Sequence, residues 1–294
     1  MALFQGTATA LITPFRNEKI DYPAMGRMVE WQLKNGIDAL VVCGTTGEAS
    51  TLSGKERVQL THFVVDLVNG RVPVIAGTGS NNTKFTTELS KEIESVGADG
   101  LLVVTPYYNK CTDTGMILHY EKIAENVEIP MILYSVKSRT GVNISPDAVR
   151  ILSQHPRIAG IKEASGDIAQ ICEMAAYISK DFNIYSGNDD MAVPVMALGG
   201  LGCISTVSNI IPQLYSQMTR DYLEGNIQEA SSRQIAIKPL IDAIFAEVNP
   251  IPLKAALNIM GMCELEYRLP LCPPSNKTQY MLYNVLREYG LVQK

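Results

Sequence analysis

Short apolar runs alternate with longer amphipathic stretches along most of the chain. Eight runs are apolar at nearly every position, which is typical of strands buried on both faces of a parallel sheet. Segments with helical spacing lie between them, near residues 22–35, 54–69, 83–96, 114–126, 145–154, 167–180 and 189–198. The predicted strands are Thr9–Thr13, Ala39–Cys43, Val72–Ala76, Gly100–Val104, Met131–Tyr134, Ile158–Lys162, Asn183–Ser186 and Cys203–Thr206.

This alternation predicts an α/β fold, because eight βα units fit a closed (β/α)8 TIM barrel of ordinary size. The remaining residues are helical by pattern and are interrupted by prolines. We expect two domains: a barrel over residues 1–224, with an active site at the carboxyl ends of its strands, and a C-terminal helical domain over residues 225–294. The predicted C-terminal helices are Leu214–Leu223, Ile227–Glu247, Pro252–Met260 and Thr278–Tyr289.

Composition and charge narrow the class of protein. The chain has 294 residues, of which 46% are hydrophobic and 19% charged, enough for a large core. A net charge of −5 disfavours nucleic acid or an anionic membrane as the main partner. Residues 191–219 lack charge, but Gly and Pro interrupt them too often for a membrane-spanning helix.

Cysteine use and the N-terminus indicate where the protein works. The six cysteines are scattered and form no CxxC pair, so we expect free thiols rather than a disulfide framework. The first 15 residues lack a basic start followed by an apolar stretch, so no signal peptide is expected. Both features favour a cytoplasmic protein.

Lys162 stands at the end of a predicted buried strand, where an ammonium group is poorly hydrated. Loss of hydration favours the neutral amine, which is a nucleophile toward carbonyl compounds. If the strand belongs to a barrel, its carboxyl end faces the catalytic mouth. This position therefore suggests imine chemistry. The alternative is a lysine that reaches solvent or pairs with Glu163.

Other predicted strand ends also have polar side chains. Thr45 and Thr46 lie between glycines in a loop that suits a carboxylate, although helix capping is an alternative. Tyr108 follows Tyr107 in a loop where packing is the default interpretation. Tyr134 can relay a proton, and an arginine five residues later, at 139, can bind a carboxylate or form a surface ion pair.

The three histidines, at positions 62, 119 and 155, lie in or beside helical stretches and not at strand ends. No spacing of His, Cys and carboxylates is typical of a metal site, and no dinucleotide fingerprint is present. We therefore expect no metal and no cofactor, and chemistry by side chains alone.

Five segments together resemble the dihydrodipicolinate synthase family, within the pyruvate-dependent class I aldolases related to N-acetylneuraminate lyase. They are GTTGE at 44–48, TPYYNK at 105–110, YSVKSRTG at 134–141, GIKEASGD at 160–167 and NPIPLK at 249–254. The similarity runs in register from about residue 4 to the C-terminus. It implies a (β/α)8 barrel that condenses pyruvate with L-aspartate 4-semialdehyde, the entry step to diaminopimelate and lysine.

The resemblance also implies roles for individual residues. Lys162 matches the Schiff-base lysine, and Tyr134, Thr45 and Tyr108 match a proton relay. The Tyr108 position usually comes from a neighbouring subunit, so a homo-oligomer, a dimer of dimers, is expected. Substrate-binding positions are matched by Thr46 (the pyruvate carboxylate), Arg139 (the carboxylate of the aldehyde) and the pocket-lining Gly187 and Ile204.

The chain departs from the family pattern at a few positions. Ser135 and Lys137 replace a usual Asn and Pro, which frees the backbone of the loop that contains Arg139. In the family's lysine-feedback site, Ser50, Asn81 and Tyr107 are compatible with a ligand. However, Phe85 replaces a glutamate and Arg57 a histidine, so a ligand ammonium meets a cation instead of a carboxylate. We expect lysine to inhibit weakly or not at all.

Two other functions remain open from the sequence. A retro-aldolase for a sugar acid, of the sialic acid or 2-keto-3-deoxy-gluconate type, would use the same imine. Such lyases usually lack the arginine at position 139, so its presence favours the condensing enzyme. A barrel that only binds a keto acid would not need the nucleophile Lys162.

Overall fold

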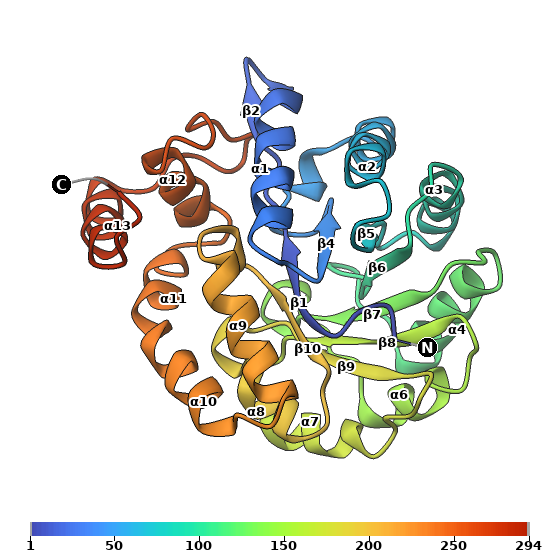
Figure 1. Cartoon of the computed structure of the whole chain (residues 1–294). Coiled ribbons are helices and arrows are strands. Elements are labelled where there is room, and N and C mark those ends of the chain that lie inside the picture. Colours follow the sequence, from blue (N-terminus) through green and yellow to red (C-terminus); the bar gives the residue numbers. More distant parts are fainter. Residues whose placement is uncertain (1, 293–294) are drawn as a thin grey trace.

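The computed structural model describes residues 2–292, and its centre is a closed barrel of parallel strands (Figure 1). Within these residues eight strands close the barrel in the order β1-β10-β9-β8-β7-β6-β5-β4, and β4 pairs with β1. The predicted TIM barrel is confirmed. The strands are β1 (Gly6–Ala10), β4 (Ala39–Val42), β5 (Val74–Gly77), β6 (Gly100–Val104), β7 (Met131–Ser135), β8 (Ile158–Glu163), β9 (Asn183–Ser186) and β10 (Gly202–Ser205).

Helices surround the barrel, and side chains that accept from backbone N–H groups mark where several of them begin. Ser53 and Glu56 form a capping box at the start of α2, and Asp167 caps α7. The surrounding helices are α1 (Tyr22–Lys34), α2 (Gly54–Val68), α3 (Thr83–Ser95), α4 (Asp113–Ala124), α5 (Lys137–Thr140), α6 (Pro146–Leu152), α7 (Ile168–Ala175), α8 (Ala192–Ala197) and α9 (Pro212–Leu223).

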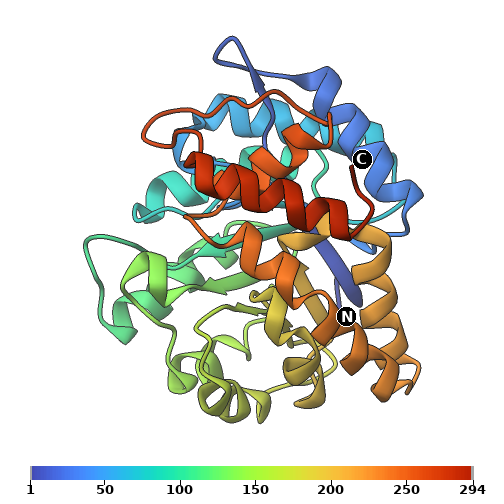
Figure 2. The ribbon, with the colours of Figure 1, turned by 90° about the vertical axis from the view of Figure 1, so that its left-hand side faces the viewer.

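Additional helices follow the barrel: α10 (Ile227–Ala236), α11 (Lys238–Ile244), α12 (Ile251–Ile259) and α13 (Asn276–Glu288). They lie along one side of the ring, and α13 lies across that side (Figures 1 and 2). Leu240, Leu253 and Leu282 from these helices share one apolar cluster with Ile12 and Cys203 of the barrel. The helical extension is therefore packed directly on the barrel. Its division from the barrel at residue 224 stays a prediction.

Several element boundaries differ from the sequence-based expectation; the predicted strand Thr9–Thr13, for example, is β1 at Gly6–Ala10. β1 ends at Ala10, because the buried residues Leu11 and Ile12 continue the apolar run without continuing the strand ladder. The segment expected as one helix over 227–247 is two helices, and Pro239 lies at the start of the second, where its missing N–H is tolerated. The expected loop after β7 contains the one-turn helix α5.

Short elements complete the chain. The strands β2 (Phe15–Arg16) and β3 (Lys19–Ile20) form a two-stranded hairpin outside the barrel. The part of the chain that the structure describes also has the 3-10 turns η1 (Ala49–Thr51), η2 (Asp189–Met191) and η3 (Val207–Asn209). Among residues 2–292, none of the helices combines the length and apolar character needed to cross a bilayer.

The barrel interior is a packed apolar core, so a binding site can form only at one of its ends. Ala8, Val41 and Ile132 belong to a single buried cluster within the strands. Phe4, which precedes β1, stacks on Tyr185 with ring centroids 4.3 Å apart and accepts a hydrogen bond from its hydroxyl. Both side chains of this pair are buried.

Candidate active site

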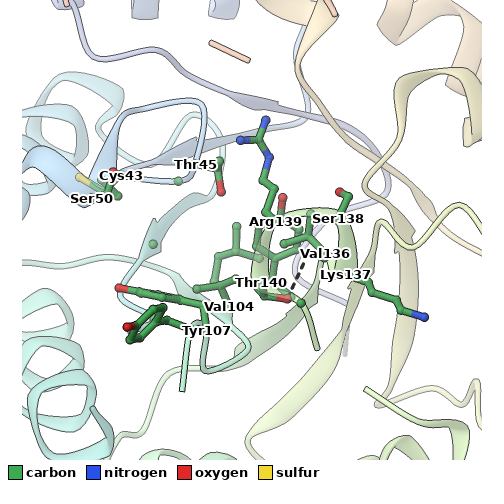
Figure 3. Close-up of a pocket in the computed structure, with 18 of the residues that line it drawn as sticks. Cys43, Thr45, Ser50, Val104, Tyr107, Val136, Lys137, Ser138, Arg139 and Thr140 are labelled. Carbon is green, nitrogen blue, oxygen red and sulfur yellow. Dashed lines mark hydrogen bonds between the residues drawn. The ribbon is translucent and has the colours of Figure 1, made fainter. Parts of the chain in front are cut away.

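A cavity of about 660 Å³ lies at the carboxyl ends of β4 to β7. Figure 3 shows that its walls come from the loops after β4 and β6 and from the segment 136–141 after β7. Cavities of this size hold small organic molecules. Six of the predicted site residues line it: Thr45, Ser50, Tyr107, Tyr108, Tyr134 and Arg139.

Lys162 lies next to Tyr134 in the barrel, because these residues are register partners on β8 and β7. Its side chain is buried, and Nζ is 4.4 Å from the centre of the Tyr134 ring. Within residues 2–292, no hydrogen bond or ion pair to a carboxylate is found for its amine. The amine of Lys162 is therefore not held by a carboxylate in this part of the chain, and it lies against the Tyr134 ring at the end of the barrel where β7 and β8 finish.

Glu163 faces the other way, because successive side chains of a strand point to opposite sides. Its carboxylate accepts hydrogen bonds from the Ser165 backbone N–H and from Gln170 Nε2. Burial raises its pKa to about 7. The pairing of Lys162 with Glu163, which the sequence left open, is therefore absent.

Asp189 is a buried carboxylate close enough to Lys162 to interact with its charge, and it was not among the residues predicted from the sequence. It accepts from the backbone N–H groups of Thr206 and Val207. Burial raises its pKa, while Ser205, these N–H groups and the charge of Lys162 oppose that shift. Asp189 lies three residues after the end of β9, and this place in a loop after a strand was the available sequence signal.

The three hydroxyl groups expected to form a relay are not joined to one another here. Thr45 and Tyr134 line the cavity, and Tyr134 is 7% exposed. Tyr108 is 92% exposed and has φ of 68°, a left-handed conformation that is unfavourable for a tyrosine. Among the described residues, no hydrogen bond links Tyr108 to Tyr134 or Thr45.

Thr46, Gly187, Ile204 and Lys162 are not among the residues that line this cavity. Asn249 Nδ2 donates to Thr46 Oγ1 at 3.0 Å. A side chain at Gly187 would meet Lys162, because a Cβ there would lie 3.1 Å from its Cε. Ile204 is fully buried in the barrel interior.

Arg139 and Lys137, on the same turn of α5, both line the cavity, and their side chains extend in different directions (Figure 3). One guanidinium nitrogen, Nη2, donates to the backbone oxygen of Asn249 at 3.1 Å. No carboxylate pairs with Arg139 in the part of the chain that the structure describes. The surface ion pair left open by the sequence is thus absent, and the guanidinium has free donors for an anion.

Ser135 helps to hold the segment that contains Arg139. Its hydroxyl donates to Asn143 Oδ1 at 2.8 Å and accepts from the Ile144 backbone N–H at 3.3 Å. Lys137 occupies the first position of α5, a position at which proline is well tolerated. The two departures from the family pattern therefore leave an ordered turn and not an open loop.

The cavity extends outward from Thr45 to Ser50, Arg57 and Tyr107. Arg57 is buried, donates to the Ala49 carbonyl oxygen, and has an Nε without a hydrogen-bond partner among the described residues. Burial lowers the pKa of Arg57. A desolvated cation is therefore present at this end of the cavity.

The other two positions of this outer group lie outside the cavity lining. Asn81 Nδ2 donates to the Tyr107 carbonyl oxygen at 3.2 Å. Phe85 is 40% exposed on α3 and lines a separate shallow groove with residues of α2. Within residues 2–292, no three or more His, Cys, Asp or Glu side chains converge as metal ligands would.

Comparisons with known proteins agree on one family. The sequence model of the Dihydrodipicolinate synthetase family matches residues 3–289. A 4-hydroxy-tetrahydrodipicolinate synthase from Thermoanaerobacter sp. (strain X514) is 48% identical over 100% of this chain and 99% of its own length.

Solved structures give the same result. The crystal structure of dihydrodipicolinate synthase from Thermotoga maritima is 44% identical, with a TM-score of 0.97 over 99% of this chain and 100% of that one. A structure described as the first monomeric dihydrodipicolinate synthase variant is also 44% identical, with a TM-score of 0.97 over 99% of this chain and 98% of that one. The likeness therefore covers the barrel and the C-terminal helices together.

Proposed function

This chain belongs to the dihydrodipicolinate synthetase family, and from that premise we propose that its barrel mouth condenses pyruvate with L-aspartate 4-semialdehyde. The product is 4-hydroxy-tetrahydrodipicolinate, the compound for which its relatives are named. The enzyme is a lyase of diaminopimelate and lysine biosynthesis. The observation that supports a role for Lys162 is its burial beside Tyr134, without an acidic contact among the described residues.

The proposed reaction begins with an imine. The neutral amine of Lys162 attacks the keto carbon of pyruvate, and one water leaves. The protonated imine then loses a methyl proton, and the electron pair of that C–H bond is delocalised toward the lysine nitrogen, which gives an enamine. The enamine carbon bonds to the aldehyde carbon of the second substrate. The amino group of that substrate then displaces Lys162 from the imine carbon, which closes the ring and frees the enzyme.

Protons move through hydroxyl groups in this scheme. Tyr134 and Thr45 line one cavity and serve as the inner part of the relay. Tyr108 completes the relay from a neighbouring copy of the chain, so the working unit is at least a dimer, and a dimer of dimers is expected. An exposed tyrosine in a left-handed conformation supports this, because a partner subunit can compensate for the backbone strain.

Each substrate carboxylate has a separate partner. Thr45 and Thr46 hold the carboxylate of pyruvate, and Gly187 and Ile204 shape the space for its keto carbon. Arg139 binds the carboxylate that only the semialdehyde brings, through a charge-assisted hydrogen-bond pair. The absence of an ion pair to Arg139 among residues 2–292 supports this role.

Regulation by lysine is proposed to be weak or absent. Ser50, Asn81 and Tyr107 supply polar groups, but the desolvated guanidinium of Arg57 faces the same cavity. A ligand ammonium would be repelled there, and the Phe85 ring offers no anionic partner. A clear inhibition curve at sub-millimolar lysine would contradict this proposal.

A cytoplasmic location is proposed from the thiols. All six cysteines are free, and Cys43, Cys203 and Cys263 are buried. Reduced, unpaired cysteines are typical of a reducing compartment.

Reductive trapping tests the proposal. Borohydride with pyruvate should attach one pyruvyl group to Lys162 in the wild type and none in Lys162→Ala, as read by peptide mass spectrometry. The wild type should turn over pyruvate with the semialdehyde, but not cleave sialic acid or 2-keto-3-deoxy-gluconate. An adduct on another residue, or faster cleavage of a sugar acid than condensation, would refute the assignment.

A further inference from the structure

One residue of the segment that joins α11 to α12 forms hydrogen bonds with two parts of the candidate active site. Asn249 is buried, and its side-chain Nδ2 donates to Thr46 Oγ1 in the loop after β4. Its backbone oxygen accepts from Arg139 Nη2 on α5. One residue of the C-terminal helical region therefore contacts the proposed binding groups for both substrate carboxylates.

The direction of the side-chain bond determines what Thr46 can do. A hydroxyl has one proton and two acceptor lone pairs. Because Asn249 Nδ2 can only donate, it uses a lone pair of Thr46 and leaves the threonine proton available. The other nearby oxygen, Thr206 Oγ1, is 3.5 Å away, at the long limit of a hydrogen bond. The Thr46 proton is therefore free for a substrate carboxylate.

The side-chain oxygen of Asn249 argues against a role of this residue in stabilising the fold. Oδ1 is buried and has no hydrogen-bond partner within residues 2–292. A buried acceptor without a partner costs free energy, so an apolar residue of similar size would be tolerated better. The amide is explained by the bond that Nδ2 makes to Thr46.

The same stretch of chain is attached to the same loop at a second point. Lys254 Nζ lies 2.5 Å from Glu48 Oε1, and both side chains are fully shielded from solvent. Glu48 is two residues after Thr46, and Lys254 is five residues after Asn249. This ion pair holds the loop and α12 together, so that the Asn249 amide stays opposite the Thr46 hydroxyl.

We propose that Asn249 is a positioning residue that directs the Thr46 hydroxyl proton toward the keto-acid carboxylate. Through its backbone oxygen it also holds the Arg139 guanidinium at the second carboxylate site. The inference rests on the proposed function, because it assigns Asn249 to the pyruvate site of that reaction. It makes the C-terminal helical region part of the active site.

The first experiment separates the two contacts. Asn249→Ala removes the side-chain donor but keeps the backbone oxygen that Arg139 uses. The pyruvate concentration for half-maximal borohydride trapping should rise about tenfold, which corresponds to about 1.4 kcal/mol. The KM for the semialdehyde should change by less than about twofold, and kcat should be retained. Equal rises for both substrates, or no rise for pyruvate, would overturn the proposal.

The matched control is Asn258→Ala. Asn258 lies on α12, outside the cavity, and its Nδ2 donates to a backbone oxygen, that of Cys263. Asn258→Ala also removes a hydrogen bond that an asparagine amide donates. Because this bond lies outside the cavity, both KM values should stay unchanged. A similar rise for pyruvate in this variant would mean that the effect is general loosening of the C-terminal region.

One further variant tests the direction of the hydrogen bond. Asn249→Asp keeps the shape of the side chain, but a carboxylate would accept the Thr46 proton. Its pyruvate affinity should therefore be lower than that of Asn249→Ala, whereas a role in packing alone predicts the opposite order. Asn249→Ser replaces the alanine variant if that variant does not fold, because serine also lacks the amide donor.

A double-mutant cycle shows whether Asn249 acts through Thr46. In a Thr46→Val background, Asn249→Ala should cause no further loss of pyruvate affinity. An additive loss would overturn the proposal. Failure of the wild type to trap pyruvate at all would instead contradict the proposed function, so the two failures are distinguishable.

Discussion

At the scale of single residues, the alternation of side chains along β8 separates two neighbouring ionisable groups. Lys162 points to the interior of the barrel mouth beside the Tyr134 ring. Glu163 points outward and is held by Ser165 and Gln170. Consecutive residues therefore have different chemistry, because a strand presents them to opposite environments.

Glu163 should make the protein less stable as pH rises. Burial raises its pKa to about 7 in the folded protein, from an ordinary value of 4.5. Between these pH values the folded chain keeps the proton and the unfolded chain releases it, so the stabilisation present below pH 4.5 is lost by about pH 7.

Relative to Glu163→Gln, the wild type should lose up to about 3 kcal/mol of unfolding free energy over that range. Urea unfolding of both proteins at several pH values, with unchanged m-values, measures this difference. A difference that does not vary with pH would show that the carboxyl group does not titrate there.

Arg139 should matter for the second substrate alone. Arg139→Ala removes a charge-assisted pair, so the KM for L-aspartate 4-semialdehyde should rise about a hundredfold. Pyruvate trapping by borohydride should be unchanged, because Lys162 and the threonine loop stay intact. Arg139→Lys keeps the charge but loses the planar guanidinium, so its KM for the semialdehyde should lie between those of the wild type and Arg139→Ala. A comparable loss in pyruvate trapping would place Arg139 in the first half-reaction.

At the scale of elements, the loop after β4 is attached to α12 by a buried ion pair. Lys254 contacts Glu48 and also lies over the Phe15 ring, 4.3 Å from its centre. Burial lowers the pKa of Lys254, and the Glu48 carboxylate opposes that shift. Such a pair is costly to break on one side, because the remaining charge is left without a partner in the interior.

Lys254→Met should therefore lower the free energy of unfolding by about 3–5 kcal/mol. The double variant Lys254→Met/Glu48→Gln should recover much of that loss, because no charge remains buried. Lys238, which pairs with Asp242 on the surface of α11, supplies the control. Lys238→Met should cost less than about 1 kcal/mol. Chemical denaturation measures all three, and equal losses for Lys254→Met and Lys238→Met would contradict this account.

At the scale of the whole molecule, one chain contains the cavity, and an exposed tyrosine stands among its lining residues. Tyr108 lines the cavity, yet most of its side chain faces solvent. An aromatic residue in this position is typical of a subunit contact. Oligomerisation would then be required for catalysis and would not contribute to stability alone.

Mixed oligomers test this directly. If Tyr108 acts across an interface, Lys162→Ala and Tyr108→Phe subunits should each be nearly inactive alone. In a mixed oligomer, the Tyr108→Phe subunit has an intact Lys162 and receives Tyr108 from its partner. Activity should reappear on co-refolding or co-expression, up to about half that of a wild-type dimer for each mixed pair, because one of its two sites is complete. No recovery in verified mixed oligomers would show that Tyr108 acts within its own chain, or not at all.

The sequence by itself determined the barrel, because each buried strand and amphipathic helix has a local pattern of apolar positions. It also indicated Lys162, Tyr134 and Arg139, because each of them lies at or shortly after the end of a strand that the apolar pattern predicts. Their catalytic roles stay predictions. The sequence did not distinguish the end of β1 from the buried residues after it, because both are apolar.

Only the tertiary structure decided which distant residues hold the site in shape. Asn249 and Thr46 are 203 positions apart, and Lys254 and Glu48 are 206 apart. The absence of a Lys162–Glu163 pair and the buried position of Asp189 were likewise decided by packing. A hydrogen bond between such distant residues leaves no periodic trace in the chain. It exists because closure of the barrel and packing of the C-terminal helices bring the two backbones together.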